Sequence, residues 1–364
     1  MTPKVLVISS YSGKQLSKNP EAEMVIRLKK SGVNIDVMTE SDNRYVKKFR
    51  EVGIKVHDYR AQKRISFGDI RYIRDVIRQR GYNIVHVFNN RAVRNAVQAT
   101  KGLKVKLVTY RGFAGHVHWY KPTSYLGHLN PGVDKITCVS NGVKEQVQRQ
   151  LFSKKQKAVT IYKGHDPEWY EAVQPRSKED LGFSSDQFVV GIVANSRPMK
   201  GIPFLLKAMK YLEEYPDIHL ALVGKNMDTA KHQQIVRKLP FPQNVHMLGF
   251  EKDVISLYPA FDVSVLSSVK GEGLSKVIIE SMMMERPVVA TNISGNDELV
   301  LHNQTGLLVP PKSPKGIAQA ITDLKNNPEK ADRLAKSGKE HIRNNFHIDR
   351  TVTEMKALYR ELTK

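Results

Sequence analysis

The chain has 364 residues, of which 40% are hydrophobic, and it carries a formal net charge of +22. This length and apolar content allow two globular domains and exclude a disordered chain. The apolar runs are too short to cross a bilayer, and the single cysteine, Cys138, cannot form an internal disulfide. Because the N-terminus leads into a strand without the layout of a signal peptide, we expect a cytoplasmic protein.

The positive charge is concentrated in the first half of the chain. Residues 1–165 hold 32 Lys and Arg against 11 Asp and Glu, whereas residues 166–364 hold 26 against 25. Such an asymmetry indicates that the first half faces something anionic. An acidic membrane surface, a phosphorylated acceptor and a nucleic acid all fit this charge.

Strands and helices alternate through the first half. The short apolar runs predict buried parallel strands, and the intervening sequence predicts helices. Gly13, after the first strand, is a candidate for close approach to a ligand, although a simple turn explains it equally well. The predicted strands are Lys4–Ile8, Asn34–Met38, Asn83–Phe88, Lys104–Thr109 and Lys135–Val139, and the predicted helices include Pro20–Ser31 and one near Asn43–Val52.

A polar, turn-rich segment around residues 165–187 separates this series from a second one. Two successive strand–helix series predict an α/β protein with two doubly wound, Rossmann-like domains that face each other across a deep cleft. We expect domains at 1–167 and 168–345, and a C-terminal helix, 346–364, that crosses back to the first. The second series has predicted strands at Phe188–Val193, Ile218–Val223, Val245–Leu248, Val263–Leu266 and Pro287–Thr291, and the chain is predicted to be helical from about Pro314.

The most informative motif is the decapeptide 271–280, Gly-Glu-Gly-Leu-Ser-Lys-Val-Ile-Ile-Glu. Glu272 follows a predicted strand, and a helix predicted from Gly273 to about Met284 is apolar on almost every side, so it is buried. Glu280, a carboxylate on that helix, needs a partner there. Backbone amides at the helix start favour a phosphate, and eight helical residues separate the two carboxylates by roughly 12 Å. The motif therefore predicts a site that holds a diphosphate-linked sugar at both ends.

The second half resembles the donor domain of the retaining glycosyltransferases of family 4, which have the GT-B fold. The resemblance is firm over residues 188–310 and looser in the first half. It rests on a series of segments in order: Val193-Ala-Asn-Ser-Arg-Pro-Met-Lys-Gly201, Val245-His-Met-Leu-Gly-Phe250, Ala260–Ser267, Glu272–Glu280, Pro287–Thr291, Gly295–Val300 and Thr305–Pro310.

This resemblance implies roles for individual residues. Arg197 and Lys200 would hold the diphosphate and stabilise negative charge on the leaving group. Glu280 would accept the ribose hydroxyls, and Glu272 would lie near the donor sugar. Leu248 and Phe250 would lie along the base, and the amides of Gly273, Leu274 and Ser275 would point at the phosphate.

The first half departs from the family in the loop that begins at Tyr110. Many relatives carry a histidine just before the glycine of this loop, near the reacting sugar, but here Arg111 stands in that position. We expect Arg111 and His116 to line the active site, with His118 as another histidine that could fold back. The alternative is a loop whose polar residues face solvent.

The resemblance implies transfer of a sugar from a nucleotide diphosphate-sugar with retention at the anomeric carbon. UDP-sugar is the first expectation for the donor and GDP-sugar the second. The sequence shows no Asp-x-Asp motif, so we expect metal independence and no cofactor. The basic segments Phe67–Arg80 and Lys144–Lys157, with the aromatic loop near Trp119 and Tyr120, predict peripheral attachment to the anionic inner face of the plasma membrane. The predicted acceptor is a lipid-linked or phosphorylated glycan in bacterial surface polysaccharide or lipopolysaccharide synthesis.

Rival interpretations remain open at this stage. A nucleic-acid binder would fit the net charge, but helix-turn-helix, zinc-ligand and stacked-aromatic motifs are absent, so we expect no nucleic-acid partner. A nucleotide-sugar epimerase, or a phosphorylase that needs pyridoxal phosphate, would share the two-domain shape. A soluble glucan-type synthase is a further alternative, against which the charge asymmetry argues weakly.

Overall fold

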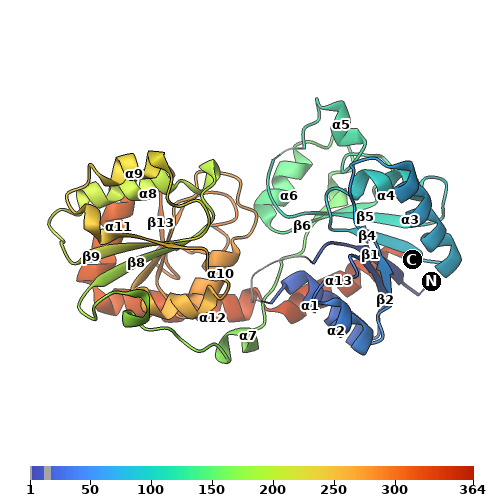
Figure 1. Cartoon of the computed structure of the whole chain (residues 1–364). Coiled ribbons are helices and arrows are strands. Elements are labelled where there is room, and N and C mark those ends of the chain that lie inside the picture. Colours follow the sequence, from blue (N-terminus) through green and yellow to red (C-terminus); the bar gives the residue numbers. More distant parts are fainter. Residues whose placement is uncertain (1, 12–17, 116) are drawn as a thin grey trace. The chain divides into compact units, whose positions relative to one another are not determined.

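The computed structural model describes residues 2–11, 18–115 and 117–364, so the candidates Gly13 and His116 lie outside the described residues. The described chain forms two compact units (Figure 1). Unit 1 contains residues 2–11, 18–164 and 348–364, and unit 2 contains residues 165–347. None of the helices that the structure describes is both long and apolar enough to cross a membrane.

Unit 1 is built on a seven-stranded parallel sheet with the strand order β3-β2-β1-β4-β5-β6-β7. Its central strands are mainly apolar because helices cover both faces of a doubly wound sheet. All four residues of β4 are buried, for example. The strands are β1 (Lys4–Ile8), β2 (Asn34–Thr39), β3 (Val56–Asp58), β4 (Ile84–Val87), β5 (Lys106–Arg111), β6 (Lys135–Cys138) and β7 (Ala158–Thr160).

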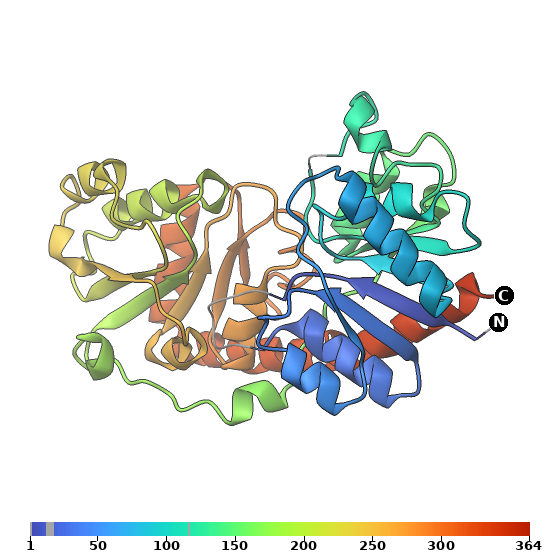
Figure 2. The same ribbon diagram turned by 45° about the vertical axis from the view of Figure 1, so that its right-hand side comes forward.

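The last helix of the chain, α13 (Ile348–Leu362), belongs to unit 1 and packs against α1 (Pro20–Lys30). Both helices can be followed side by side in Figure 2, in red and blue. Tyr359 of α13 also bonds to a sheet residue, since its hydroxyl lies 2.9 Å from Nδ1 of His86. The other unit 1 helices are α2 (Val46–Glu51), α3 (Phe67–Arg80), α4 (Val93–Thr100), α5 (Pro122–Tyr125) and α6 (Asn141–Gln148).

Two buried histidines should make the stability of unit 1 depend on pH. Burial lowers the pKa of His86 and of His128 to about 3, against an ordinary value of 6.5. The unfolded chain therefore binds more protons than the native one between these values, so stability falls as pH falls below 6.5. Each histidine contributes about 1.4 kcal/mol per pH unit well below pH 6.5.

This prediction can be checked by urea unfolding of unit 1 between pH 6.5 and 5. The variant His86→Gln keeps a polar side chain between the hydroxyls of Tyr359 and Thr137 but cannot titrate. We expect the free energy of unfolding to depend less steeply on pH in the variant. The difference should correspond to the uptake of up to one proton fewer on unfolding. Equal slopes in the two proteins would contradict a neutral His86 in the native state.

Unit 2 is built on a six-stranded parallel sheet with the order β10-β9-β8-β11-β12-β13. Strand order reverses between β8 and β11, which makes that point the topological switch where open α/β sheets bind ligands. The strands are β8 (Phe188–Val193), β9 (Ile218–Val223), β10 (Val245–Gly249), β11 (Val263–Leu266), β12 (Val288–Thr291) and β13 (Leu307–Val309).

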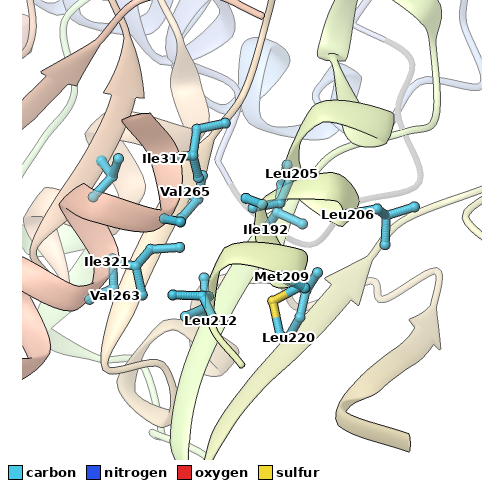
Figure 3. Packing of buried hydrophobic residues seen from close by; sticks show 14 of the residues in the cluster. Ile192, Leu205, Leu206, Met209, Leu212, Leu220, Val263, Val265, Ile317 and Ile321 are labelled. Atoms are coloured by element: carbon cyan, nitrogen blue, oxygen red, sulfur yellow. The ribbon is translucent and has the colours of Figure 1, made fainter. Parts of the chain in front are cut away.

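The hydrophobic core of unit 2 lies between this sheet and the helices α8 (Ile202–Ala208) and α11 (Pro314–Asn326). Figure 3 shows Ile192 of the sheet close to Leu205 of α8, Leu220 close to Met209, and Ile317 and Ile321 of α11 beside Val265 and Val263. The remaining helices of unit 2 are α7 (Glu168–Glu171), α9 (Ala230–Val236), α10 (Lys276–Met283) and α12 (Pro328–Asn345), together with 3-10 turns at Pro198–Lys200, Met209–Tyr211 and Ile255–Ala260.

The structure adds elements that the sequence analysis did not predict. The strands β3, β7 and β13 have three residues each, too few to show a hydrophobic pattern. The region predicted to be helical from about Pro314 consists of three helices, of which only the last had been predicted as a separate helix. Pro328 separates α11 from α12 because a proline disfavours helical geometry in the residue before it.

Candidate active site

A pocket of about 230 Å³ lies at the carboxyl edge of the unit 2 sheet. Its walls come from segments that follow three neighbouring strands and from one face of α10, as expected at a topological switch point. The backbone after β8 and β9 forms one side, and Glu280 of α10 reaches it from another. The lining residues are Val193, Ala194, Asn195, Lys200, Val223, Gly224, Phe250, Glu251, Val254, Lys276, Val277 and Glu280.

Lys200 is held at this pocket by the loop that follows β11. Its Nζ lies 2.6 Å from Oε1 of Glu272, and Ser268 Oγ donates to the same carboxylate oxygen at 2.5 Å. The hydroxyl of Ser267 donates to the backbone carbonyl of Lys200 at 2.9 Å. Glu272 is 7% exposed, so these partners offset the cost of burying its carboxylate. The loops after β8 and β11 therefore present a fixed ammonium group at the switch point.

Gly201 makes this loop arrangement possible. Its φ is +66°, and a Cβ at this position would lie 2.0 Å from the carbonyl oxygen of Ser267. Any other residue would push the two loops apart and break the Ser267 hydrogen bond to Lys200. The glycine after Lys200 is thus required by close backbone approach.

Glu280 is a buried carboxylate with a cation one helical turn away. Its side chain belongs to the most buried part of α10, and the residue is 2% exposed. Nζ of Lys276 lies 3.0 Å from Oε1 of Glu280. Burial raises the pKa of Glu280, while Lys276 and the hydroxyl of Tyr258 oppose the rise. This carboxylate can accept hydrogen bonds from ligand hydroxyls in the pocket.

The helix of the motif begins later than the sequence predicted. We expected it to start at Gly273, but α10 begins at Lys276, and Ser275 is its N-cap. The separation of roughly 12 Å was based on one continuous helix from Glu272 to Glu280, and the structure does not have that helix. Gly273, Leu274 and Ser275 form the turn before α10, and they do not line the pocket. The amides at the helix start belong to Lys276, Val277 and Ile278, which have no earlier helical carbonyl to bond.

The structure separates Arg197 from Lys200. Arg197 is exposed and lines a second, larger hollow between α8 and α9, whereas Lys200 lines the pocket with Glu280. Phe250 lines the pocket as expected, with Nζ of Lys225 4.7 Å from the centre of its ring. Leu248, on β10, is half-buried and does not line the pocket.

Arg111 lies in unit 1, at the end of β5, and is turned into its own loop. It is 4% exposed, and its guanidinium donates to the carbonyl oxygens of Phe113 and Gly115. The guanidinium carbon also lies 4.6 Å from the centre of the Phe113 ring. These contacts fix the backbone of the loop that includes Phe113 and Gly115. In this structure the Arg111 guanidinium therefore bonds to its own loop, and its expected role in lining the active site stays a prediction.

Sequence analysis missed several residues that build the site. Ser267 and Ser268 were given no role, because serines after a strand are common in loops. Asn195 and Glu251 were likewise indistinguishable from solvent-facing loop residues. Lys276 could have been found, since a lysine four residues before a buried glutamate on one helix predicts an ion pair. Among the described residues, no group of three or more His, Cys, Asp or Glu side chains is placed to hold a metal ion.

Comparisons with known proteins agree with this geometry. Residues 173–341 match the family described as Glycosyl transferases group 1, and residues 22–169 match Glycosyltransferase Family 4. An uncharacterised glycosyltransferase of Methanocaldococcus jannaschii is 26% identical over 88% of this chain and 84% of its own length. A lipopolysaccharide core biosynthesis glycosyltransferase of Rhizobium meliloti, LpsD, is 24% identical over 63% of this chain and 64% of that protein.

Solved structures show the same fold. A glycosyltransferase from Rickettsia africae superposes with a TM-score of 0.85 at 20% identity, covering 100% of this chain and 99% of that one. HepE from Anabaena, solved in complex with UDP, has a TM-score of 0.78 at 20% identity, covering 98% of this chain and 100% of that one. Two Rossmann-like units with parallel sheets therefore constitute an α/β protein of the GT-B fold. The chain is an enzyme, a glycosyltransferase similar to those of family 4.

Proposed function

We propose that this glycosyltransferase moves a sugar from a nucleotide diphosphate-sugar, with retention, to a lipid-linked or phosphorylated glycan in bacterial surface polysaccharide synthesis. The observation that carries the proposal is that Lys200 and Glu280 line one pocket at the switch point of unit 2. A diphosphate and a pair of ribose hydroxyls need these two charges. UDP is the preferred nucleotide and GDP the second choice.

In the proposed mechanism Lys200 and the free amides at the start of α10 stabilise the charge that develops on the departing diphosphate. Glu280 accepts the ribose hydroxyls, and Phe250 provides an apolar wall for the base. The departing phosphate oxygen helps to deprotonate the acceptor on the same face of the sugar. No metal ion or other cofactor takes part in this proposal.

A donor screen tests this assignment. UDP-, GDP- and ADP-sugars are added separately, and we expect UDP-sugars to raise the unfolding temperature most, because a ligand that binds only the native state stabilises it. Transfer to an acceptor should retain the anomeric configuration by NMR and persist in excess EDTA. A donor rearranged without any acceptor would support an epimerase instead, and loss of turnover in EDTA would rule out metal independence.

The acceptor side of the proposal rests on the surface of unit 1. The rings of Trp119, Tyr120 and Phe152 form an aromatic patch, in which the Trp119 ring meets Tyr120 at 5.8 Å and Phe152 at 5.6 Å between centroids. These residues are 51%, 59% and 75% exposed. Gln150 accepts a hydrogen bond from the amide of Trp119, which joins the two segments that carry the patch.

Cations border the aromatic patch. Lys121 Nζ lies 5.9 Å from the Tyr120 ring, and the exposed Arg149 and Lys154 flank Phe152 in the sequence. Aromatic rings with a polar edge favour the interface of a bilayer, and each nearby basic residue adds about 1 kcal/mol of attraction to an anionic leaflet. We propose that the aromatic patch rests on the inner face of the plasma membrane, where a lipid-linked acceptor is found.

Vesicle binding tests this attachment. In a Trp169→Phe background, Trp119 is the only tryptophan, so its emission reports on the aromatic patch. We expect a blue shift and co-sedimentation with phosphatidylglycerol vesicles but little with phosphatidylcholine vesicles. Phe152→Ser should weaken sedimentation about tenfold, whereas Tyr211→Ser, an exposed aromatic of unit 2, should not. Equal binding to both vesicle types would argue against attachment.

A further inference from the structure

A groove of about 970 Å³ lies between α8 and α9 in unit 2, and it shares no lining residue with the pocket of Lys200 and Glu280. Figure 1 shows the two helices side by side on the same face of the sheet. Its size is within the range of ligand sites. We name it the lysine groove, after the residues that line it. They include Ser196, Arg197, Pro198, Phe204, Lys207, Lys210, Tyr211, Lys231, Gln234, Ile235, Lys238 and Leu239.

The lysine groove is strongly cationic in a half of the chain that is nearly neutral. No Asp or Glu lines it, in the part of the chain that the structure describes, and its five cations make no ion pair with any described residue. All five are exposed. Residues 166–364 as a whole hold 26 Lys and Arg against 25 Asp and Glu. Like charges gathered without partners create a positive potential that attracts an anion. The cations are Arg197, Lys207, Lys210, Lys231 and Lys238.

The spread of these charges indicates the kind of anion. The lysines come from both walls, so a single phosphate cannot contact them all, whereas a polymer with repeated negative groups can. Exposed charges are individually weak, and several must act together. The groove also offers apolar surface, since Tyr211 is 56% exposed and Phe204 and Ile235 are half-buried. Pyranose rings have a C–H face that packs on an aromatic ring, so a sugar polymer uses both features.

The lysine groove is connected to the pocket by one short turn. Arg197 lines the groove and Lys200 lines the pocket, and the 3-10 turn Pro198–Lys200 joins them. A chain lying in the groove therefore contacts the loop that carries the ammonium group of the pocket. We infer that the lysine groove binds an anionic glycan, a polymer with carboxylate, phosphate or sulfate groups. The inference rests on the proposed function, because an enzyme that extends surface polysaccharide meets such chains.

A local probe is needed to test this, because polyanions will also bind the basic unit 1. Gln234 is exposed and lines the groove, so Gln234→Cys places one reactive thiol there. The native Cys138 is fully buried, and burial raises the pKa of its thiol to about 12, so it will not be labelled. A dye on residue 234 then reports binding in the groove only. The full chain is titrated with hexagalacturonate, a sulfated heparin hexasaccharide, neutral maltohexaose and hexaglutamate.

We expect a saturable change in dye emission with the two anionic glycans, weakened by salt, and no change with maltohexaose. Lys207→Gln with Lys238→Gln, one lysine on each wall, should weaken binding about tenfold. The matched control, Lys101→Gln with Lys104→Gln, removes two exposed lysines of unit 1 and should leave the response unchanged.

Three results would overturn the inference: an equal response to hexaglutamate, an equal response to maltohexaose, or an equal loss in the control variant. The first would mean that any acidic chain binds, and the second that charge is irrelevant. Donor binding is measured separately by the unfolding temperature with UDP-sugars. A positive groove titration without donor stabilisation would contradict the proposed function alone, and the reverse would contradict this inference alone.

Discussion

Replacing Lys200 with methionine is expected to lower the rate of sugar transfer by about 10²–10³-fold, the range seen when one fixed group that stabilises a developing negative charge is removed. The ammonium is held 2.6 Å from Glu272 and is positioned by the Ser267 hydrogen bond to its backbone. Methionine keeps an unbranched side chain, shorter by one atom, and removes the ammonium group with its charge and its hydrogen-bond donors. The loss should appear mainly in kcat, since the interaction grows as the diphosphate departs. Single-turnover kinetics with a UDP-sugar donor measure it.

Two further variants are needed to interpret the result for Lys200→Met. Lys200→Met leaves the buried carboxylate of Glu272 with Ser268 as its remaining partner, which can weaken the fold. The double variant Lys200→Met with Glu272→Gln removes that buried charge and should restore the unfolding temperature without restoring the rate. Lys315→Met, an exposed lysine on α11, is the matched control and should transfer sugar normally. Recovery of activity in the double variant would mean that Lys200 serves only the fold.

Much of the fold was predictable from the sequence, because its longer strands have clear apolar patterns. β8, β9 and β11 are mainly apolar, with His219 and Ser264 as their polar residues, and their bounds agree with the prediction. The short strands β7 and β13 were missed, since three residues carry no period and depend on a neighbour for their hydrogen bonds. The start of α10 was misplaced because Gly273 and Leu274 continue the apolar pattern of the helix. Their backbone is instead set by a close approach to Gly295, where a Cβ would lie 2.2 Å from the carbonyl oxygen of Gly273.

A site residue was predictable only where a charged side chain lies in an apolar segment that is expected to be buried. Glu280 stood out because a carboxylate among apolar helix residues needs a reason, and the structure places it in the pocket with Lys200. Arg197 could not be distinguished from Lys200 by sequence, because the 3-10 turn between them decides which side each faces. Arg111 looked like a ligand contact, but its hydrogen bonds to nearby carbonyls arise from a loop shape that no residue pattern reveals.

Glu280→Gln is expected to raise KM for the nucleotide-sugar by about 10–100-fold while leaving the fold intact. A hydrogen bond to a charged group contributes about 1.5–3 kcal/mol, which a neutral amide largely forfeits. The variant should be no less stable than the wild type, because the pKa of Glu280 is raised and not lowered in the fold. Burial raises the pKa of Glu280 above 4.5, so its ionisation costs stability as pH rises from 4.5 through the raised pKa. The uncharged amide avoids that cost, and thermal unfolding at pH 7 should show equal or greater stability in the variant.

The ion pair with Lys276 then determines the pH at which donor binding begins. The ionised carboxylate is the stronger acceptor, so KM should fall as pH rises through the raised pKa of Glu280. Lys276 lowers that pKa from 3.0 Å away, and Lys276→Met should therefore move the whole acid limb of kcat/KM to higher pH. Lys276→Arg should return the acid limb to the pH of the wild type, because arginine keeps the positive charge. The control Lys315→Met should leave the acid limb where it is. An acid limb at the same pH in Lys276→Met and wild type would mean that Glu280 does not titrate in donor binding, and its raised pKa would then be a property of the fold alone.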